Sequence, residues 1–339
     1  MFSTDRGDRS ATAPDRVRPC PKIGSMTRQV WTRAMLAEAG ISDRAVRTRL
    51  RHGGLVRIAR GTYMTREDVD ALGPVGVHLA RARLVGSRFD ADEALSHVTA
   101  AVVHGLDVWD APLRRIHVTR PPTRSCRVSD DLHIHTSDLD GDVVDVDGLR
   151  VTSLARTVVD VARTLSRPRA LVIGDSALRA DPTAHLDLPR ILAACRGRTG
   201  IVAAESVARL VDGRSESVGE SLSRLHMIEA GLPMPDLQHE IVVRDGRRYR
   251  VDFLWRELGI VGEFDGSGKY TERHDLLAEK EREDALRDLG LEVIRWNWAE
   301  LSRFHVVVDR FERARRRQQA RRAALERETV IGARYNPLR

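Results

Sequence analysis

The sequence contains few aromatic residues, cysteines and lysines. Aromatic residues make up only 4% of the 339 residues, and the three cysteines, Cys20, Cys126 and Cys195, lie far apart. This spacing fits neither a disulfide framework nor a cysteine-ligated zinc site. No apolar run approaches the roughly 18 residues of a membrane span, and the N-terminus lacks the apolar segment of a secretory signal. We therefore expect a cytoplasmic protein with no membrane partner.

The bulk composition is that of a globular protein. Apolar residues account for 42% of the chain and charged residues for 31%, which is enough apolar side chain to bury a core and excludes wholesale disorder. At about 150 residues per domain, the length predicts two or three domains.

Positive charge is concentrated at the two ends of the chain. Residues 1–69 hold 14 Lys and Arg against 7 Asp and Glu, a net charge of +7, and residues 309–339 hold 10 against 4, a net charge of +6. Because the whole chain carries a net charge of +7, residues 70–308 carry −6. Basic ends around an acidic middle indicate a polyanionic partner such as DNA. An arginine-rich composition with solvated ends is the alternative. Lysine occurs only three times, at Lys22, Lys269 and Lys280.

The first 69 residues divide into a tail and a small helical segment. Residues 1–25 are rich in Pro, Arg, Asp and Ser without periodicity, which predicts a disordered tail and makes Met26 a candidate start of the folded chain. In residues 26–69, Thr32 and Ser42 are typical N-cap residues for helices over about 33–39 and 43–51. Two short alternating strands follow, joined at residues 59–60.

The second of these helices carries a basic stripe. Its members recur at helical spacing: Arg44, Arg47, Thr48 and Arg51. Two short helices followed by a strand pair predict a winged helix, which would place this stripe in the major groove of DNA. A protein-binding winged helix with a solvated basic face is the alternative.

Residues 70–212 are expected to form an α+β domain. The expected helices cover about 75–85, 91–105, 153–165 and 168–180, and the expected strands 115–119, 131–136, 142–146 and 149–152. Five of the histidines in this range are candidate ligands: His97, His104, His117, His133 and His135. Because no carboxylate or cysteine joins them at a recognised ligand spacing, we interpret them as structural and assign this domain no chemistry.

Residues 27–200 resemble antitoxins of the abortive-infection AbiEi type. The runs that carry the resemblance are ISDRAVRTRLRHGGLVRIARGTYMT, SHVTAAVVHGLDVW and GLRVTSLARTVVDVAR. The resemblance implies DNA binding by the winged helix, an accessory α/β domain and a toxin–antitoxin setting with a cognate toxin as a candidate partner. It implies no catalytic residue.

Residues 213–308 follow the order helix, three strands, helix, strand. The expected helices cover about 217–230 and 271–289, and the expected strands 238–244, 248–255, 259–266 and 291–298. If residues 257–258 form the turn between the second and third strands, Asp252 faces Glu263, and Asp265 shares their side of the hairpin. Opposed carboxylates need compensation, and hard oxygen ligands suit Mg²⁺ or Mn²⁺. Solvent-exposed acids without a metal are the alternative.

This block resembles the PD-(D/E)XK nuclease superfamily, in the branch of the very-short-patch-repair endonucleases. The matching runs are ESLSRLHMIEAGLPMPDLQHEI, RVDFLW, GEFDGSGKY and EKEREDALRDLGLEVIRWNW. The resemblance implies a mixed four-stranded sheet flanked by helices, with the motif acids at Asp252 and Glu263 and the first-helix acid at Glu220.

The sequence departs from the family pattern at one position. The family's lysine, two residues after the motif glutamate, is Asp265 here. A cation at that position would stabilise the attacking water and the charge that develops on phosphate. Lys280 is the first candidate to replace it and Lys269 the second.

The sequence therefore predicts an α/β multidomain protein with a winged helix, a middle α+β domain, a restriction-endonuclease-like domain and an Arg-rich helical tail over residues 309–339. We expect a Mg²⁺-dependent DNA endonuclease that the winged helix targets, in DNA repair or phage defence. The alternative is a non-catalytic, antitoxin-like transcriptional regulator with a degenerate nuclease fold. The DNA site and the oligomeric state are not predicted.

Overall fold

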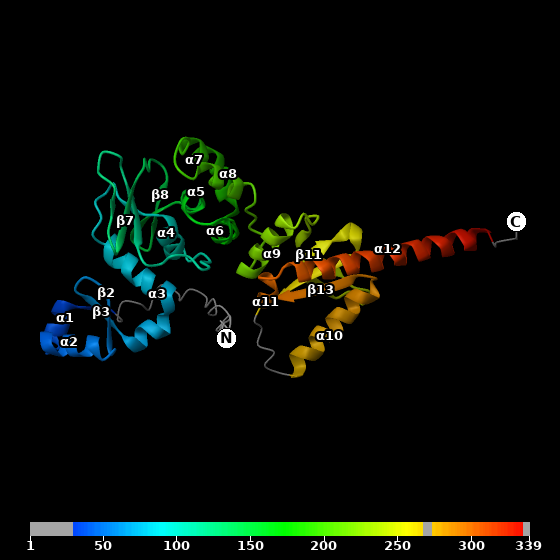
Figure 1. Cartoon of the computed structure of the whole chain (residues 1–339), viewed down its shortest axis with the longest axis horizontal. Helices are drawn as coiled ribbons and strands as arrows, with labels where there is room; N and C mark the ends of the chain where they lie inside the picture. The colour runs from blue at the N-terminus through cyan, green and yellow to red at the C-terminus, as the bar shows by residue number, and fades with distance from the viewer. Residues whose placement is uncertain (1–29, 267–272, 335–339) are drawn as a thin grey trace, which may run out of the picture. The chain divides into compact units, whose positions relative to one another are not determined.

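The computed structural model describes residues 30–266 and 273–334, without the side chains of residues 273–278 and 328–334. The predicted tail over residues 1–25 and Lys269 lie outside the described residues. The chain has a mixed α/β fold with two compact units that divide at residues 218 and 219 (Figure 1). Within the described residues, no helix combines the length and the apolarity needed to cross a bilayer.

The first elements of the chain build a three-stranded sheet with two helices. They are β1 (Trp31–Thr32), α1 (Arg33–Glu38), α2 (Asp43–Arg51), β2 (Leu55–Ala59) and β3 (Thr62–Thr65), in the sheet order β1-β3-β2. The predicted N-caps are confirmed, because the hydroxyl of Thr32 accepts a hydrogen bond from the amide of Met35 and that of Ser42 from the amide of Ala45.

Helix α3 (Arg66–Gly86) connects this sheet to the larger one that follows. It is kinked at Gly73, which has a φ of +64° before Pro74. Ala80 packs with the first sheet and Leu79 with the second. The helix is longer than predicted, because Thr65 caps it ten residues before the expected start.

A six-stranded sheet has the order β6-β7-β5-β4-β9-β8. Its strands are β4 (Ala94–Leu95), β5 (Ile116–Arg120), β6 (Arg127–Val128), β7 (Leu132–Thr136), β8 (Val143–Val146) and β9 (Leu149–Thr152). The helix predicted over 91–105 is wrong in its first half, because residues 94–95 form β4 and α4 covers only His97–Val103. A short apolar run fits a buried strand and a buried helix equally well, so periodicity alone could not separate them.

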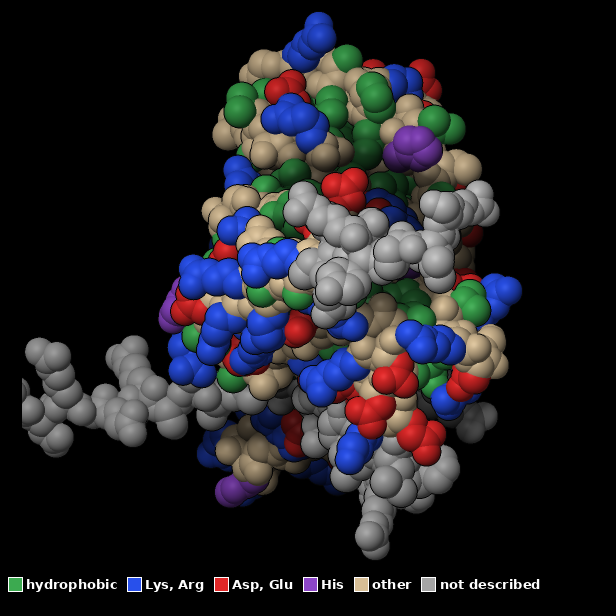
Figure 2. Space-filling model, turned by 90° about the vertical axis from the view of Figure 1, so that its right-hand side faces the viewer, with side chains coloured by type: hydrophobic (Ala, Val, Ile, Leu, Met, Phe, Trp, Pro, Cys, Tyr) green, Lys and Arg blue, Asp and Glu red, His purple; other side chains and the backbone are tan. Residues whose placement is uncertain are grey.

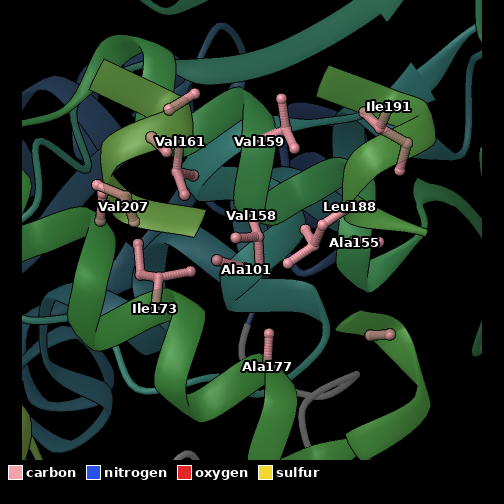
Figure 3. Close-up of a cluster of buried hydrophobic side chains, with 14 of the residues drawn as sticks. Ala101, Ala155, Val158, Val159, Val161, Ile173, Ala177, Leu188, Ile191 and Val207 are labelled. Carbon is pink, nitrogen blue, oxygen red and sulfur yellow. The ribbon is translucent and has the colours of Figure 1, made fainter. Parts of the chain in front are cut away.

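A layer of helices forms the largest apolar core of this unit (Figure 3). The elements are α5 (Leu154–Thr164), α6 (Arg167–Ala180), the 3₁₀ turn η2 (Pro182–Leu186), α7 (Leu188–Ala194) and α8 (Ile201–Ala208). Helices α5 and α6 were predicted, and the last three elements were not. Val158, Ile173 and Ile191 are fully buried where these helices meet.

Gly200, at the start of α8, allows that helix to approach α5. Its φ is +83°, and a Cβ atom there would lie 2.1 Å from the carbonyl oxygen of Arg163. We predict that Gly200→Ala lowers the free energy of unfolding by about 3 kcal/mol, from backbone strain and steric overlap together. Gly197→Ala is the control, because Gly197 has a φ of +76° but nothing within 4 Å. Equal losses for the two variants in urea denaturation would contradict the proposed overlap.

The second unit has the helix and strand order predicted from the sequence. Its elements are α9 (Val218–Glu229), β10 (Asp236–Val242), β11 (Arg248–Trp255), β12 (Ile260–Asp265), α10 (Arg273–Asp288) and β13 (Glu292–Asn297), and the sheet order is β10-β11-β12-β13. The first three strands are antiparallel, and β12 and β13 are parallel. The predicted hairpin register is confirmed, since Leu254 pairs with Val261 and Trp255 with Ile260.

The turn between β11 and β12 is longer than the two residues predicted. Residues Arg256–Leu258 form the 3₁₀ turn η3, and Gly259 follows with a φ of +65°. The pairing of the two strands is nevertheless the predicted one, with Trp255 opposite Ile260 on the two sides of this turn and Gly259.

Short helix α11 (Trp298–Leu301) leads into α12 (His305–Arg334), whose first half belongs to the core of this unit. Val307, Phe311 and Ala314 are buried on one helical stripe. The side-chain amide of Gln318 continues the stripe and donates to the carbonyl oxygens of Gly259 and Gly290. The predicted Arg-rich tail therefore packs on the sheet over this part of its length.

Candidate functional site

The predicted acids lie on the face of the second unit's sheet that α10 covers. Leu254 of β11, Val261 of β12 and Leu286 of α10 share one apolar core. Side chains alternate along a strand, so Asp252 and Glu263 point to the same face as Leu254 and Val261. The carboxylate of Asp252 accepts a hydrogen bond from the amide of Phe264, at 2.8 Å, and therefore reaches across to β12 beside Glu263.

Glu220 of α9 joins Asp252 through a residue that the sequence analysis did not single out. The side-chain amide of Gln238 donates to Glu220 at 2.8 Å and lies 3.4 Å from a carboxylate oxygen of Asp252. Gln238 has a φ of +51°, a conformation rare for residues other than glycine. No pattern in the sequence reveals this conformation, because it depends on where β10 lies against β11.

Gly219 allows α9 to approach β12 at this point. A Cβ atom at Gly219 would lie 1.9 Å from the ring of Phe264. Close approach of the helix to the strand places the next residue, Glu220, at the sheet, where it is buried.

Two arginines flank Glu263. Its carboxylate lies 2.5 Å from Arg282 of α10 and 2.7 Å from Arg295 of β13. Burial raises the pKa of Glu263, and the two guanidinium groups oppose that shift. Arg295 also contacts Glu279 and lies 3.6 Å from Asp265.

The structure separates the predicted cation from the acids. Lys280 is exposed on α10, whereas Glu279 and Arg282 on the same helix contact residues of the sheet. Among the residues that the structure describes, the cations in contact with Glu263 are thus Arg282 and Arg295. Parallel pairing of β12 with β13 sets Arg295 beside Glu263 in register, and the sequence carries no signal for this pairing.

Among the described residues, no three of these carboxylates place their oxygen atoms within 4.8 Å of one another. The donor set nevertheless fits a hard cation, since Asp252, Glu263 and Glu220 offer only oxygen ligands. One oxygen of Glu263, Oε1, is also buried without a hydrogen bond of good geometry. The positive charges of Arg282 and Arg295 oppose a cation there, so binding requires at least one guanidinium group to move away.

The basic stripe on α2 is exposed in the first unit. Arg44, Arg47 and Arg51 are exposed and Thr48 is half-buried, while Val46 on the opposite side is in the core. Within the described part of the chain, these three arginines form no ion pair with a carboxylate. Elsewhere the surface is mixed: on the face in Figure 2, basic side chains are interspersed with acidic ones. An exposed row of unneutralised arginines suits contact with phosphates.

Comparison with known proteins supports a regulatory role for the N-terminal segment. Residues 27–73 match the family described as "Transcriptional regulator, AbiEi antitoxin". Two curated Mycobacterium tuberculosis proteins, uncharacterized protein MT2308 of strain CDC 1551 / Oshkosh and uncharacterized protein Rv2248 of strain H37Rv, are each 35% identical over 246 residues. The match covers 72% of this chain and 86% of each relative.

A solved structure gives a weaker match. The crystal structure of the RV2827C protein from Mycobacterium tuberculosis has 17% sequence identity and a TM-score of 0.32. The match covers 63% of this chain and 83% of that one. This TM-score is too low to infer a shared fold.

Proposed function

We propose that this chain, which belongs to the same family as the mycobacterial proteins MT2308 and Rv2248, is a DNA-binding transcriptional regulator of the AbiEi antitoxin type. The observation that carries the proposal is the exposed basic face of α2 within the segment that matches the antitoxin family. The order α1-α2-β2-β3 with β1 closing the sheet supports a winged helix with α2 as its recognition helix. A cognate toxin is the partner that such a regulator would also bind.

The test is the dependence of DNA affinity on salt. Each phosphate contact that is lost lowers the slope of log K against log salt by about one unit. We expect the triple variant Arg44→Ala, Arg47→Ala, Arg51→Ala to bind DNA more weakly and to show a slope flatter by about two to three units. Fluorescence anisotropy with labelled duplex DNA at several salt concentrations measures both quantities.

Arg88→Ala provides the control, because Arg88 is exposed in the same unit but outside the stripe. It should leave the slope unchanged. An unchanged slope for the triple variant would mean that α2 does not contact the phosphates, and the regulator would then bind DNA through another surface.

A second candidate function is metal-dependent hydrolysis of DNA by the C-terminal unit. The α-β-β-β-α-β order with a mixed sheet, and the link from Glu220 through Gln238 to Asp252, favour it. Asp252, Glu263 and Asp265 would hold Mg²⁺ or Mn²⁺, which when bound polarises a phosphate and activates water.

The residues of the chain would supply the remaining contacts of this reaction. Whichever of Arg282 and Arg295 stays beside Glu263 would carry the positive charge that the absent motif lysine would otherwise provide. Gln238 would orient Glu220 and Asp252 by its amide. If this site is inactive, the C-terminal unit is a degenerate nuclease fold, and the protein acts only as a DNA-binding regulator.

A further inference from the structure

Three histidines from different elements of the first unit meet at one point. His97 begins α4, His117 lies on β5 and His135 lies on β7. Each offers a ring nitrogen, and the three nitrogens lie within 4.8 Å of one another. The parallel pairing of β5 and β7 sets His117 in register with His133, so His117 and His135 share one face of the sheet. From their spacing in the sequence these residues are interpreted as structural, because spacing does not show that they meet in the fold.

One pair of ring nitrogens lies near the separation of two ligands on one metal ion. Nδ1 of His117 lies 3.0 Å from Nε2 of His135, whereas the rings of His97 and His135 are stacked with their centroids 3.7 Å apart. Two nitrogens bound to one tetrahedral zinc at about 2.0–2.1 Å are separated by roughly 3.3 Å. The nitrogens of His117 and His135 are therefore close to this separation, and the stacked ring of His97 must turn for its nitrogen to join them.

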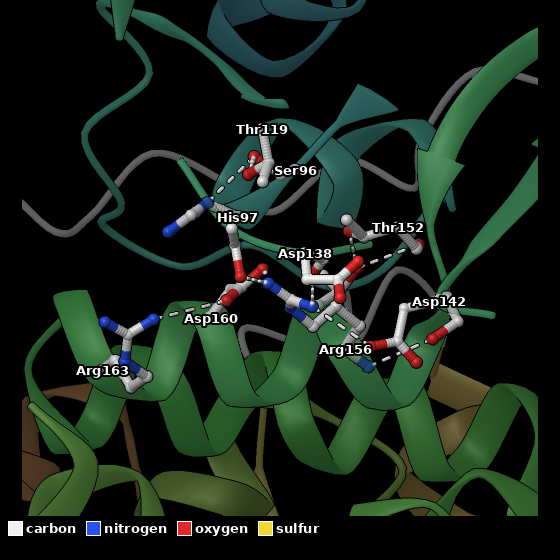
Figure 4. Close-up of polar contacts among 12 residues, drawn as sticks. Ser96, His97, Thr119, Asp138, Asp142, Thr152, Arg156, Asp160 and Arg163 are labelled. Carbon is white, nitrogen blue, oxygen red and sulfur yellow. Dashed lines mark hydrogen bonds and ion pairs between the residues drawn. The ribbon is translucent and has the colours of Figure 1, made fainter. Parts of the chain in front are cut away.

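A second shell of hydroxyl groups holds the ring of His97. Its Nδ1 lies 2.9 Å from Oγ of Ser96, and the hydroxyl of Thr119 donates to that same oxygen at 2.7 Å. Figure 4 shows the other ring nitrogen of His97 pointing away from Ser96. When Nδ1–H donates to Ser96, Nε2 carries the free lone pair, which is the usual arrangement of a ligating histidine.

His97 is buried and has a φ of +54°, in the left-handed region. Such backbone conformations occur preferentially at functional sites.

We propose that His97, His117 and His135 bind one Zn²⁺ ion. Three imidazole ligands suit zinc, whereas Mg²⁺ prefers oxygen ligands. The fourth position would be open, since His97 and His135 line a cavity of about 280 Å³ that Arg163 and Arg198 also line. Three protein ligands with an open position are typical of zinc sites that bind water or a substrate. The two arginines make a small anion the class of ligand that would occupy this position.

The experiment is a zinc titration of the full-length chain, stripped of metal beforehand, against a chromophoric chelator and with Mg²⁺ in excess. We expect one Zn²⁺ per chain and an affinity that falls at least about 100-fold in His117→Gln and in His135→Gln. His104→Gln is the matched control, because His104 is half-buried and bonds to the carbonyl of Thr152 outside the cluster. It should keep the wild-type affinity.

A second measurement on the wild-type chain is independent of how the variants fold. Co²⁺ substituted for zinc should give the visible absorption of a tetrahedral nitrogen site without sulfur charge-transfer bands. Absence of tight zinc binding, or equal affinity in the wild type and both cluster variants, would overturn the proposal. So would loss of the ion in Glu263→Gln with the cluster intact, because the ion would then lie elsewhere.

Discussion

Glu263→Gln is expected to reduce Mg²⁺- or Mn²⁺-dependent nicking of supercoiled plasmid by at least about 100-fold. The substitution keeps the size of the side chain but removes its negative charge, so the remaining acids hold a divalent cation less well. The same loss is expected for Asp252→Asn. We expect the metal to raise the melting temperature of the wild type, because ligand binding stabilises the folded state, and each variant should lose this rise.

The control is Glu240→Gln, which removes an exposed carboxylate from β10 of the same sheet. It should nick DNA as the wild type does. Nicking by Glu263→Gln at the wild-type rate would show that this acid is not part of the site. If the wild type binds DNA but cuts none with either metal, the chain is a regulator with a degenerate nuclease fold, and Asp265 at the lysine position is the proximate cause.

Arg156→Met is expected to lower the free energy of unfolding of the first unit by about 3–5 kcal/mol. The side chain of Arg156 is only 3% exposed and bonds to Asp160 at 3.0 Å and to Asp142 at 3.1 Å (Figure 4). It also donates to the hydroxyl of Ser137 and to the carbonyl oxygen of Asp138. Removing it leaves Asp160 buried with its nearest remaining cation, Arg163, at 3.7 Å.

The burial of Asp160 determines the size of this effect. Burial raises the pKa of Asp160, and the charge of Arg156 opposes the shift. Without Arg156 the carboxyl group must be buried as an uncompensated charge or take up a proton. Urea denaturation followed by circular dichroism measures the loss.

Two further variants separate charge from packing. Arg190→Met removes a half-exposed arginine that contacts the same Asp142 at 2.6 Å, and it should cost less than about 1 kcal/mol. Adding Asp160→Asn to Arg156→Met should recover part of the stability, because the buried charge is then gone. If the double variant is no more stable than Arg156→Met alone, the loss in the free energy of unfolding comes from packing.

The sequence by itself determined features that depend on near neighbours in the chain. Thr32 and Ser42 cap helices at the predicted positions, because an N-cap bonds to an amide three residues away. The register of the β11–β12 hairpin was predicted correctly from a two-residue turn, although the actual turn is the longer 3₁₀ helix η3 with Gly259. The element order of the C-terminal unit also followed from apolar periodicity and glycine breaks.

Only the tertiary structure decided which side chains surround each candidate site. Arg295 lies beside Glu263 because β12 and β13 pair in parallel after a helical connection, and no local pattern fixes that register. The three histidines of the proposed zinc site meet because β5 and β7 pair while α4 begins beside them. Contacts between segments distant in sequence depend on packing of whole elements, which periodicity within one element does not encode.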